Sequence, residues 1–217
     1  MNKLVRPVAV IGALTGLFGL TLQYILLYAD MSTDGASPLD VLWRYYVYFT
    51  LLTNTFVTLV FARAAWKPES LAGLNAPRIE LMAVTSILFV CIVYNLLLAS
   101  RWDPQGWQKV ADVVVHNVVP AIFAIFWLLR PHGALKWRHA AFAATWPLAY
   151  AIYGLTRGLF DGYYPYFFMD PTTTGYGAIA LNLAGLVAAF IIGALLLIGL
   201  SRALARPKAQ DAATSAT

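Results

Sequence analysis

A small set of polar side chains interrupts the long apolar stretches of this sequence, and these residues could bind or transform a ligand. They carry a hydroxyl, an imidazole, three amides and a guanidinium, on Thr50, His116, Asn54, Asn95, Asn182 and Arg157. A buried polar group without a partner is costly in hydrocarbon, so such side chains tend to face a bundle interior or a cavity. His116 is the only histidine within an apolar stretch, and an imidazole can take a proton near neutral pH.

The same residues do not form a metal-ligand pattern. The chain has one cysteine, Cys91, so neither an intramolecular disulfide nor a cysteine-based zinc site can form. No cluster of Cys, Asp and Glu accompanies His116 at ligand spacing, and a zinc or haem site needs several ligands. The sequence therefore predicts no metal and no cofactor.

The elements that hold these residues are apolar enough to be membrane helices. The chain of 217 residues is 60% hydrophobic and only 12% charged, whereas a soluble domain has about 25% charged residues. Its mean hydropathy is +0.68. An α-helix of about 20 apolar residues spans a hydrocarbon layer of about 30 Å. This composition excludes a soluble enzyme, a disulfide scaffold and a disordered chain.

The intervals between charged residues predict an all-α integral membrane protein, a bundle of six transmembrane helices within residues 1–206. The predicted helices cover residues 7–29, 44–65, 80–100, 110–130, 139–158 and 177–201. The first resembles a signal peptide, but its uncharged stretch of 23 residues is longer than an h-region of about 7 to 15. Residues 207–217 have nothing apolar to bury and predict a disordered cytoplasmic tail.

The basic residues indicate the orientation of these helices. When alternate loops are assigned to opposite sides, eleven Lys and Arg residues fall on one side and four on the other. The positive-inside rule then places both termini in the cytoplasm and the loops at 30–43, 101–109 and 159–176 outside, as in a multi-pass protein of the bacterial inner membrane. Topology thus accounts for the net charge of +5 without nucleic acid.

In this topology the polar residues share one depth. Thr50 and Asn54 lie about two to three turns inside the outer end of the second helix, and His116 lies about two turns down the fourth. Asn95, Arg157 and Asn182 lie near the outer ends of the third, fifth and sixth helices. Five helices thus bring polar groups to the outer third of the bundle, which predicts a polar pocket that opens outward.

Packing is the alternative interpretation of these residues. Thr50 could bond back to the carbonyl of Tyr46, and asparagines often pair between helices with a gain of about 0.6 to 2 kcal/mol. His116 is harder to assign to packing. Pro120 has no N–H to donate to the carbonyl of His116, which leaves a free acceptor and predicts a kink.

The fifth predicted helix carries an aromatic and basic stripe. Trp146, Tyr150, Tyr153 and Arg157 recur at i, i+4, i+7 and i+11 and therefore share one face. The stripe either lines the pocket, where Tyr150 and Arg157 would contact a substrate, or packs against lipid or neighbouring helices.

Two further patterns concern the sixth helix and the loop before it. Gly185, Ala189 and Gly193 form a ridge of small residues, which predicts close packing against a neighbouring helix. The loop at 158–176 contains seven aromatic residues. Such a segment favours the headgroup interface, as an aromatic belt or as a lid over the pocket.

Three short motifs resemble a known family. They are Tyr-Phe-Thr-Leu-Leu-Thr-Asn at residues 48–54, His116 followed by Pro120, and Gly-Tyr-Tyr-Pro-Tyr-Phe at residues 162–167. In their order and placement they resemble the androgen-induced protein family of transmembrane threonine hydrolases, and more closely its bacterial Pr-six-Pr branch. The resemblance implies hydrolysis of fatty acid esters of hydroxy fatty acids by a threonine nucleophile and a histidine, which by position are Thr50 and His116.

The chemistry of these residues is compatible with that implication. A threonine hydroxyl is a weak nucleophile and needs a base within about 2.6 to 3.2 Å, a role that a neutral imidazole can fill. Side-chain donors such as Asn54, Asn95 or Arg157 would hold the oxyanion. The expected substrate is a lipid or acyl ester whose chains lie among apolar helix faces and membrane lipids.

Two other classes of function are compatible with the sequence. A non-catalytic lipid-binding or scaffold protein would keep the pocket without needing both Thr50 and His116. A small-molecule transporter would have internal repeats or broken helices near the midplane, whereas here the polar residues cluster in the outer third.

The predicted topology can be tested by chemical labelling. Single cysteines placed within residues 159–176 should react with a membrane-impermeant maleimide added to intact cells, whereas a cysteine beside Lys136 should react only after lysis. The reverse pattern would overturn the orientation and the outward-facing pocket with it.

Overall fold

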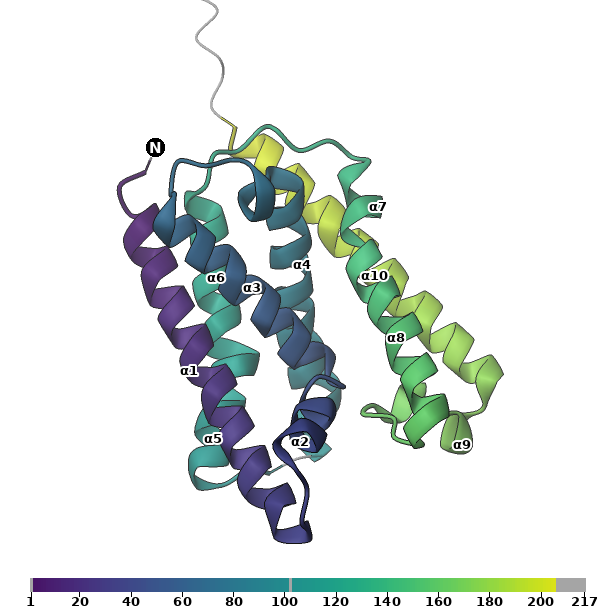
Figure 1. Cartoon of the computed structure of the whole chain (residues 1–217). Helices are drawn as coiled ribbons and strands as arrows, with labels where there is room; N and C mark the ends of the chain where they lie inside the picture. Colours follow the sequence, from purple (N-terminus) through teal and green to yellow (C-terminus); the bar gives the residue numbers. More distant parts are fainter. Residues whose placement is uncertain (1, 102, 206–217) are drawn as a thin grey trace, which may run out of the picture.

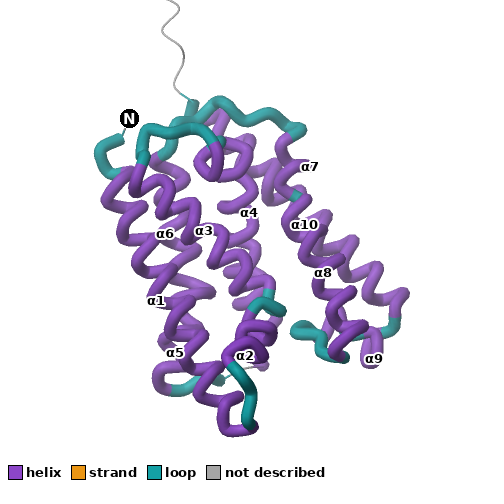
Figure 2. Tube along the Cα trace, viewed as in Figure 1, coloured by secondary structure: helices purple, strands orange, loops and turns teal. Residues whose placement is uncertain are grey.

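The computed structural model describes residues 2–101 and 103–205, and every regular element in this part of the chain is a helix (Figure 1). Figure 2 shows the same arrangement, with short loops at both ends of a helical bundle. The predicted all-α class is therefore confirmed for the described residues. The predicted disordered tail at 207–217 lies outside them.

The helices follow one another along the chain with short connections. In order they are α1 (Val5–Met31), η1 (Ser32–Asp34), α2 (Pro38–Tyr45), α3 (Phe49–Trp66), η2 (Gly73–Asn75), α4 (Pro77–Val93), η3 (Tyr94–Leu98), η4 (Ala99–Arg101), α5 (Gly106–Val113), η5 (Val114–Val118), α6 (Val119–Leu129), α7 (His139–Ala143), α8 (Thr145–Asp161), η6 (Phe167–Met169), α9 (Pro171–Thr174) and α10 (Tyr176–Ala203). Of the short elements, η3 and η5 are π-helical turns and η1, η2, η4 and η6 are 3₁₀ turns.

Five helical segments among the described residues are long and apolar enough to cross a membrane. They are Val5–Asp34, Phe49–Trp66, Pro77–Arg101, Gly106–Leu129 and Tyr176–Ala203. This composition is compatible with a multi-pass membrane protein. The predicted helix at 139–158 is not among the five, because the chain divides there at Ala144 into α7 and a 17-residue α8.

The closest helix packing occurs on α1, whereas the sequence predicted it on the sixth helix. A Cβ atom added at Gly12 or Gly16 would collide with Phe61 or Thr58 of α3, and one at Gly19 would meet Val114 at 2.6 Å. Glycine therefore lets the backbone of α1 lie directly on its neighbours.

The ridge predicted on the sixth helix does not serve this purpose. A Cβ atom added at Gly185 would meet nothing within 4 Å, and one at Gly193 would make only an ordinary contact with Thr85 at 3.9 Å. The expectation that Gly185, Ala189 and Gly193 form a close helix contact was therefore wrong. Small-residue spacing alone does not say which face of a helix has a neighbour.

The N-terminal end of α4 and the C-terminal end of α6 are joined by a buried ion pair. Arg130 Nε lies 2.8 Å from a carboxylate oxygen of Glu80, and both side chains are almost fully buried. The guanidinium also donates to the carbonyls of Pro68 and Ser70, at 2.5 and 2.6 Å. Because each guanidinium nitrogen of Arg130 has a partner, the loop between α3 and α4 is fixed to the end of the bundle.

The opposite end of the bundle contains the short helix α2 (Figure 1). Ser37 and Asp40 form a capping box at its start, and Pro38 occupies the first turn. The helix ends at Tyr45, and residues 46–48 connect it to α3. The helix predicted at 44–65 therefore begins at Phe49, five residues later than predicted. The carbonyls of the α2–α3 junction have no partner within a helix and need donors from elsewhere.

The role of the α1 glycines can be tested by adding methyl groups. Gly16→Val should lower the free energy of unfolding by about 1 to 3 kcal/mol or more, because the new side chain has no room against Thr58. Gly185→Val is the matched control and should leave the thermal midpoint in detergent unchanged. Equal midpoints for the two variants would contradict the packing of α1 on α3.

Candidate functional site

An apolar cavity lies between α3, α4, α8 and α10, under the segment that joins α8 to α9. We call residues 162–170 of this segment the lid. The empty space is about 660 Å³ when the open mouth is counted, and about 70 Å³ of it can hold the centre of a water molecule. Its wall consists of Phe49, Thr50, Phe89, Val90, Val93, Tyr94, Leu98, Pro147, Tyr150, Ala151, Tyr166, Phe168, Met169, Leu183, Leu186 and Val187.

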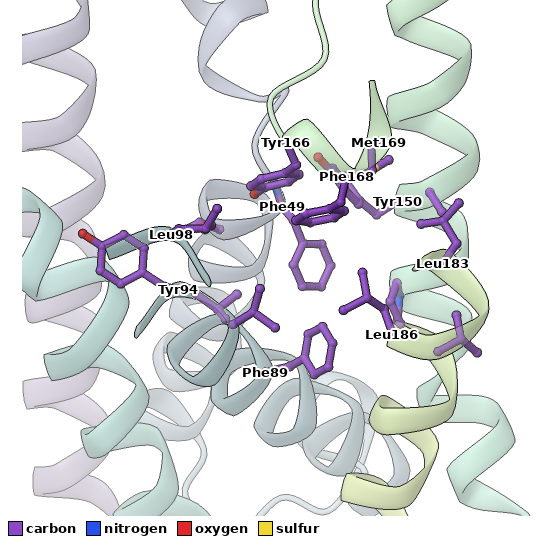
Figure 3. A pocket seen from close by; sticks show the side chains of 16 residues that line it. Phe49, Phe89, Tyr94, Leu98, Tyr150, Tyr166, Phe168, Met169, Leu183 and Leu186 are labelled. Atoms are coloured by element: carbon purple, nitrogen blue, oxygen red, sulfur yellow. The ribbon is translucent and has the colours of Figure 1, made fainter. Parts of the chain in front are cut away.

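The wall is apolar apart from a few hydroxyl groups. Figure 3 shows the ring of Phe49 reaching toward the middle of the cavity, with Phe89 below it and Leu186 of α10 at its side. Tyr166 and Phe168 of the lid cover the same space and stack on each other, with ring centroids 5.2 Å apart. An acyl chain could contact these side chains through apolar surface.

Thr50 carries the only aliphatic hydroxyl among the residues of this wall. Thr55 and Thr85 donate to the carbonyls four residues earlier, at 2.8 and 2.7 Å, which is the packing use of a helical threonine. Within the described part of the chain, Thr50 makes no such bond to Tyr46, whose carbonyl instead accepts from Tyr153 at 3.0 Å. The hydroxyl of Thr50 is therefore available to a partner outside its own helix.

The lid holds the start of α3 through Tyr166. The backbone N–H of Phe49, which has no partner within the helix, donates to the Tyr166 hydroxyl at 3.1 Å. Burial raises the pKa of Tyr166, and the Thr50 side chain beside its hydroxyl opposes that shift. Tyr166 is thus a neutral phenol next to Thr50 at physiological pH.

Two further contacts secure the lid. The hydroxyls of Tyr48 and Tyr163 lie 2.6 Å apart, and Asn182 of α10 donates to the carbonyl of Phe168 at 3.2 Å. Asn182 was predicted to bind substrate, and the structure places its amide on the lid backbone.

The stripe on α8 binds the α2–α3 junction. Tyr150 donates to the carbonyl of Val47 at 2.9 Å, and Tyr153 donates to that of Tyr46. One turn earlier, Trp146 donates to the Thr53 hydroxyl at 3.1 Å. Of the two interpretations of the stripe, packing against neighbouring helices is the one found, although Tyr150 also lines the cavity.

Arg157, the last member of the stripe, lies outside the cavity wall. Its Nε pairs with Asp161 at 3.2 Å, and Trp43 of α2 covers its guanidinium at 3.9 Å. Burial alone would raise the pKa of Asp161, but hydrogen bonds from Tyr163, Trp43 and Arg157 lower it overall. The predicted role of Arg157 as an oxyanion donor is therefore not supported by its position; it anchors α8 to α2.

His116 is held by Asp112 and Tyr94, neither of which was among the predicted site residues. Its Nδ1 lies 3.1 Å from Asp112 Oδ1 and 3.0 Å from the Asp112 carbonyl. Its ring stacks on Tyr94, with centroids 3.6 Å apart and planes 11° apart. Tyr94 in turn donates to Asp112 Oδ2 at 2.6 Å, and its ring forms part of the cavity wall.

Asn54 joins the helix of Thr50 to the turn of His116. Its amide nitrogen donates both to the carbonyl of Thr50, at 2.8 Å, and to that of Val115, at 3.0 Å. Thr50 and His116 thus lie on backbones that meet at one side chain. No hydrogen bond joins their side chains among the described residues, so their direct contact stays a prediction.

Asn95 makes a second bridge on the other side of His116. Its amide donates to Asn117 Oδ1 at 2.9 Å and to the carbonyl of Cys91 at 2.8 Å. Neither Asn54 nor Asn95 lines the cavity, so both act here as links between helices. Thr50 and Tyr150 are the predicted site residues that the structure brings to the cavity wall.

The sequence indicated only part of the arrangement around His116. Asp112 precedes His116 by four residues, the spacing that places two side chains on one helix face. Tyr94 had no comparable pattern. Within residues 2–101 and 103–205, no three His, Cys, Asp or Glu side chains gather in a way that could hold a metal ion.

The chain matches no protein-family model, no curated protein and no solved structure. The resemblance to the androgen-induced protein family therefore stays a prediction, and the site itself is the basis for proposing a function.

The contact between α8 and the junction can be tested at Tyr150. Tyr150→Phe should lower the free energy of unfolding by about 1 to 3 kcal/mol, because the carbonyl of Val47 loses its donor in a buried position. Tyr28→Phe, at an exposed ring on α1, is the control and should leave the thermal midpoint unchanged. A Tyr150→Phe protein as stable as this control would show that the bond does not hold α8.

Proposed function

We propose that this protein is an intramembrane hydrolase of lipid acyl esters, with Thr50 as the nucleophile and His116 as the base. The observation that carries the proposal is the position of Thr50, which makes no hydrogen bond back to its own helix among the described residues and lies in the wall of an apolar, open-mouthed cavity. The cavity suits an acyl chain, and Asn54 keeps the turn of His116 against the helix of Thr50.

In the proposed reaction, the proton of Thr50 Oγ1 passes to the imidazole of His116 as Oγ1 attacks the ester carbonyl carbon. The carbonyl oxygen becomes an oxyanion. The neutral hydroxyl of Tyr166, beside Thr50, donates a hydrogen bond to it. The tetrahedral species collapses to an acyl-threonine, and the alcohol leaves with the proton from the imidazole. Water then repeats the sequence and releases the fatty acid.

We also propose six membrane crossings with both termini in the cytoplasm of a bacterium. In support, α7 and α8 together cover residues 139–161, apart from the break at Ala144. The N-terminal end of α1 and the C-terminal end of α10 lie at the same end of the bundle, which suits an even number of crossings (Figure 1). The ester would then react near the outer headgroups, while its chains enter between α4 and α10.

Lipid binding without catalysis is the main alternative, since it needs the same cavity. It does not require the Thr50 hydroxyl, so labelling of the purified protein with a fluorophosphonate probe separates the two. Attachment at Thr50 supports the hydrolase, whereas lipid retention without attachment supports a binding protein. A transporter would need the cavity to open to both sides in turn.

The proposed reaction can be tested by substitution at both residues. Thr50→Ala and His116→Ala should each reduce turnover of 4-nitrophenyl decanoate at least about 10²-fold, and the double variant should be no worse than either, because the two residues act as one unit. Thr50→Ser should keep part of the activity, since the hydroxyl remains. Turnover is measured per folded molecule, with folding checked by monodispersity in detergent.

Thr55→Ala is the matched control, because Thr55 lies on the same helix and bonds back to Leu51. It should retain wild-type turnover. If well-folded His116→Ala also does, the hydrolase proposal is wrong.

A further inference from the structure

Two π-helical turns face each other beside the cavity, and each carries one ring of a stacked pair. Tyr94 is the first residue of η3, and His116 lies in the middle of η5. In each turn, a backbone N–H bonds to the carbonyl five residues earlier, from Ala99 to Tyr94 and from Val119 to Val114. Such wide turns are rare and occur frequently at functional sites.

Each wide turn has a local cause. Pro120 has no N–H and its ring would press on the carbonyl of His116, so the helix widens just before it. On η3, the side chain of Asn95 donates to the Cys91 carbonyl and competes with the backbone there. Both distortions are therefore fixed by the sequence of the turns.

We propose that Asp112, supported by Tyr94, is the positioning residue for His116 in the reaction proposed above. This inference rests on the proposed function. The Nδ1 of His116 faces two oxygens of Asp112, one from the carboxylate and one from the backbone. Because oxygens accept and do not donate there, Nδ1 carries the proton and Nε2 keeps the lone pair that a base needs.

Tyr94 restricts the orientation of both Asp112 and His116. Its hydroxyl donates to Asp112 Oδ2 at 2.6 Å, so each carboxylate oxygen has one partner. Its ring covers one face of the imidazole at a centroid distance of 3.6 Å, which prevents rotation of His116 in that direction. Among the described residues, Nε2 has no hydrogen-bond partner, and it is the nitrogen left for the nucleophile.

The charge of Asp112 also has a role in the step itself. When Oγ1 of Thr50 attacks the ester, its proton moves to Nε2 and the imidazole becomes positive. Asp112 keeps its own charge, accepts the Nδ1–H throughout and stabilises the imidazolium. When the alcohol departs, Nε2 returns the proton to the leaving oxygen, so Asp112 neither gains nor loses a proton in the cycle.

A purely structural role for Asp112 predicts a different outcome from a positioning role. A structural acid would hold η3 against α5, and its loss would alter the cavity wall through Tyr94 and weaken substrate binding. A positioning acid leaves the wall unchanged and acts only on proton transfer. The two roles therefore separate in KM and kcat.

The experiment measures hydrolysis of 4-nitrophenyl decanoate and the rate of fluorophosphonate attachment to Thr50, using the full chain in detergent. Asp112→Asn should lower kcat by about 10²- to 10⁴-fold and slow attachment, with KM changed by less than about twofold. Asp112→Glu should recover part of kcat. Tyr94→Phe should lower kcat by about tenfold, because Asp112 loses one donor.

Asp40→Asn and Tyr24→Phe are matched controls. Asp40 caps α2 and Tyr24 donates to the Pro38 carbonyl, and both lie at the outer end away from the cavity wall.

Wild-type kcat in Asp112→Asn, together with an inactive Thr50→Ala, would overturn the positioning role and leave the hydrolase intact. A higher KM at unchanged kcat would overturn it as well. Unchanged turnover in Thr50→Ala would instead overturn the proposed function. If Asp112→Asn does not fold, the test uses Asp112→Glu and Tyr94→Phe. Wild-type kcat in both of these variants would overturn the positioning role of Asp112.

Discussion

In an apolar surrounding, every backbone carbonyl that a helix end leaves free needs a donor from the protein itself, and the α2–α3 junction is where this constraint shapes the molecule. Tyr150 and Tyr153 of α8 supply the donors for Val47 and Tyr46, and Tyr166 accepts from the N–H of Phe49. These bonds dock α8 and the lid on α3. They also create the wall of the cavity and place Thr50 within it.

The second organising feature is the irregular backbone opposite this junction. Regular α-helices through Tyr94 and His116 would present different faces, whereas the wide turns η3 and η5 bring the two rings into a stack. Asp112 then joins the two residues through hydrogen bonds to His116 Nδ1 and the Tyr94 hydroxyl. Proline and asparagine, which disturb a helix locally, thus serve to aim side chains.

Helix packing gives an instructive contrast between pattern and outcome. The small-residue spacing on α10 is as regular as that on α1, but only α1 has a neighbour close enough to need glycine. The aromatic stripe on α8 likewise allowed two interpretations, and its hydroxyls turned out to be donors for a junction more than 90 residues earlier in the chain. Periodicity in the sequence identifies which residues share a helix face, but it does not predict which element packs against that face.

The sequence by itself determined the helical class, the approximate ends of the long helices and the presence of polar groups inside them, because length, hydropathy and charge act locally. It also predicted Thr50 and His116 as a pair. Only the tertiary structure decided that Thr50 lies in a cavity wall, that Arg157 and Asn182 hold other elements, and that Asp112 and Tyr94 surround His116. These facts depend on which helices meet and at what rotation, and such contacts between distant segments are not encoded in any single helix.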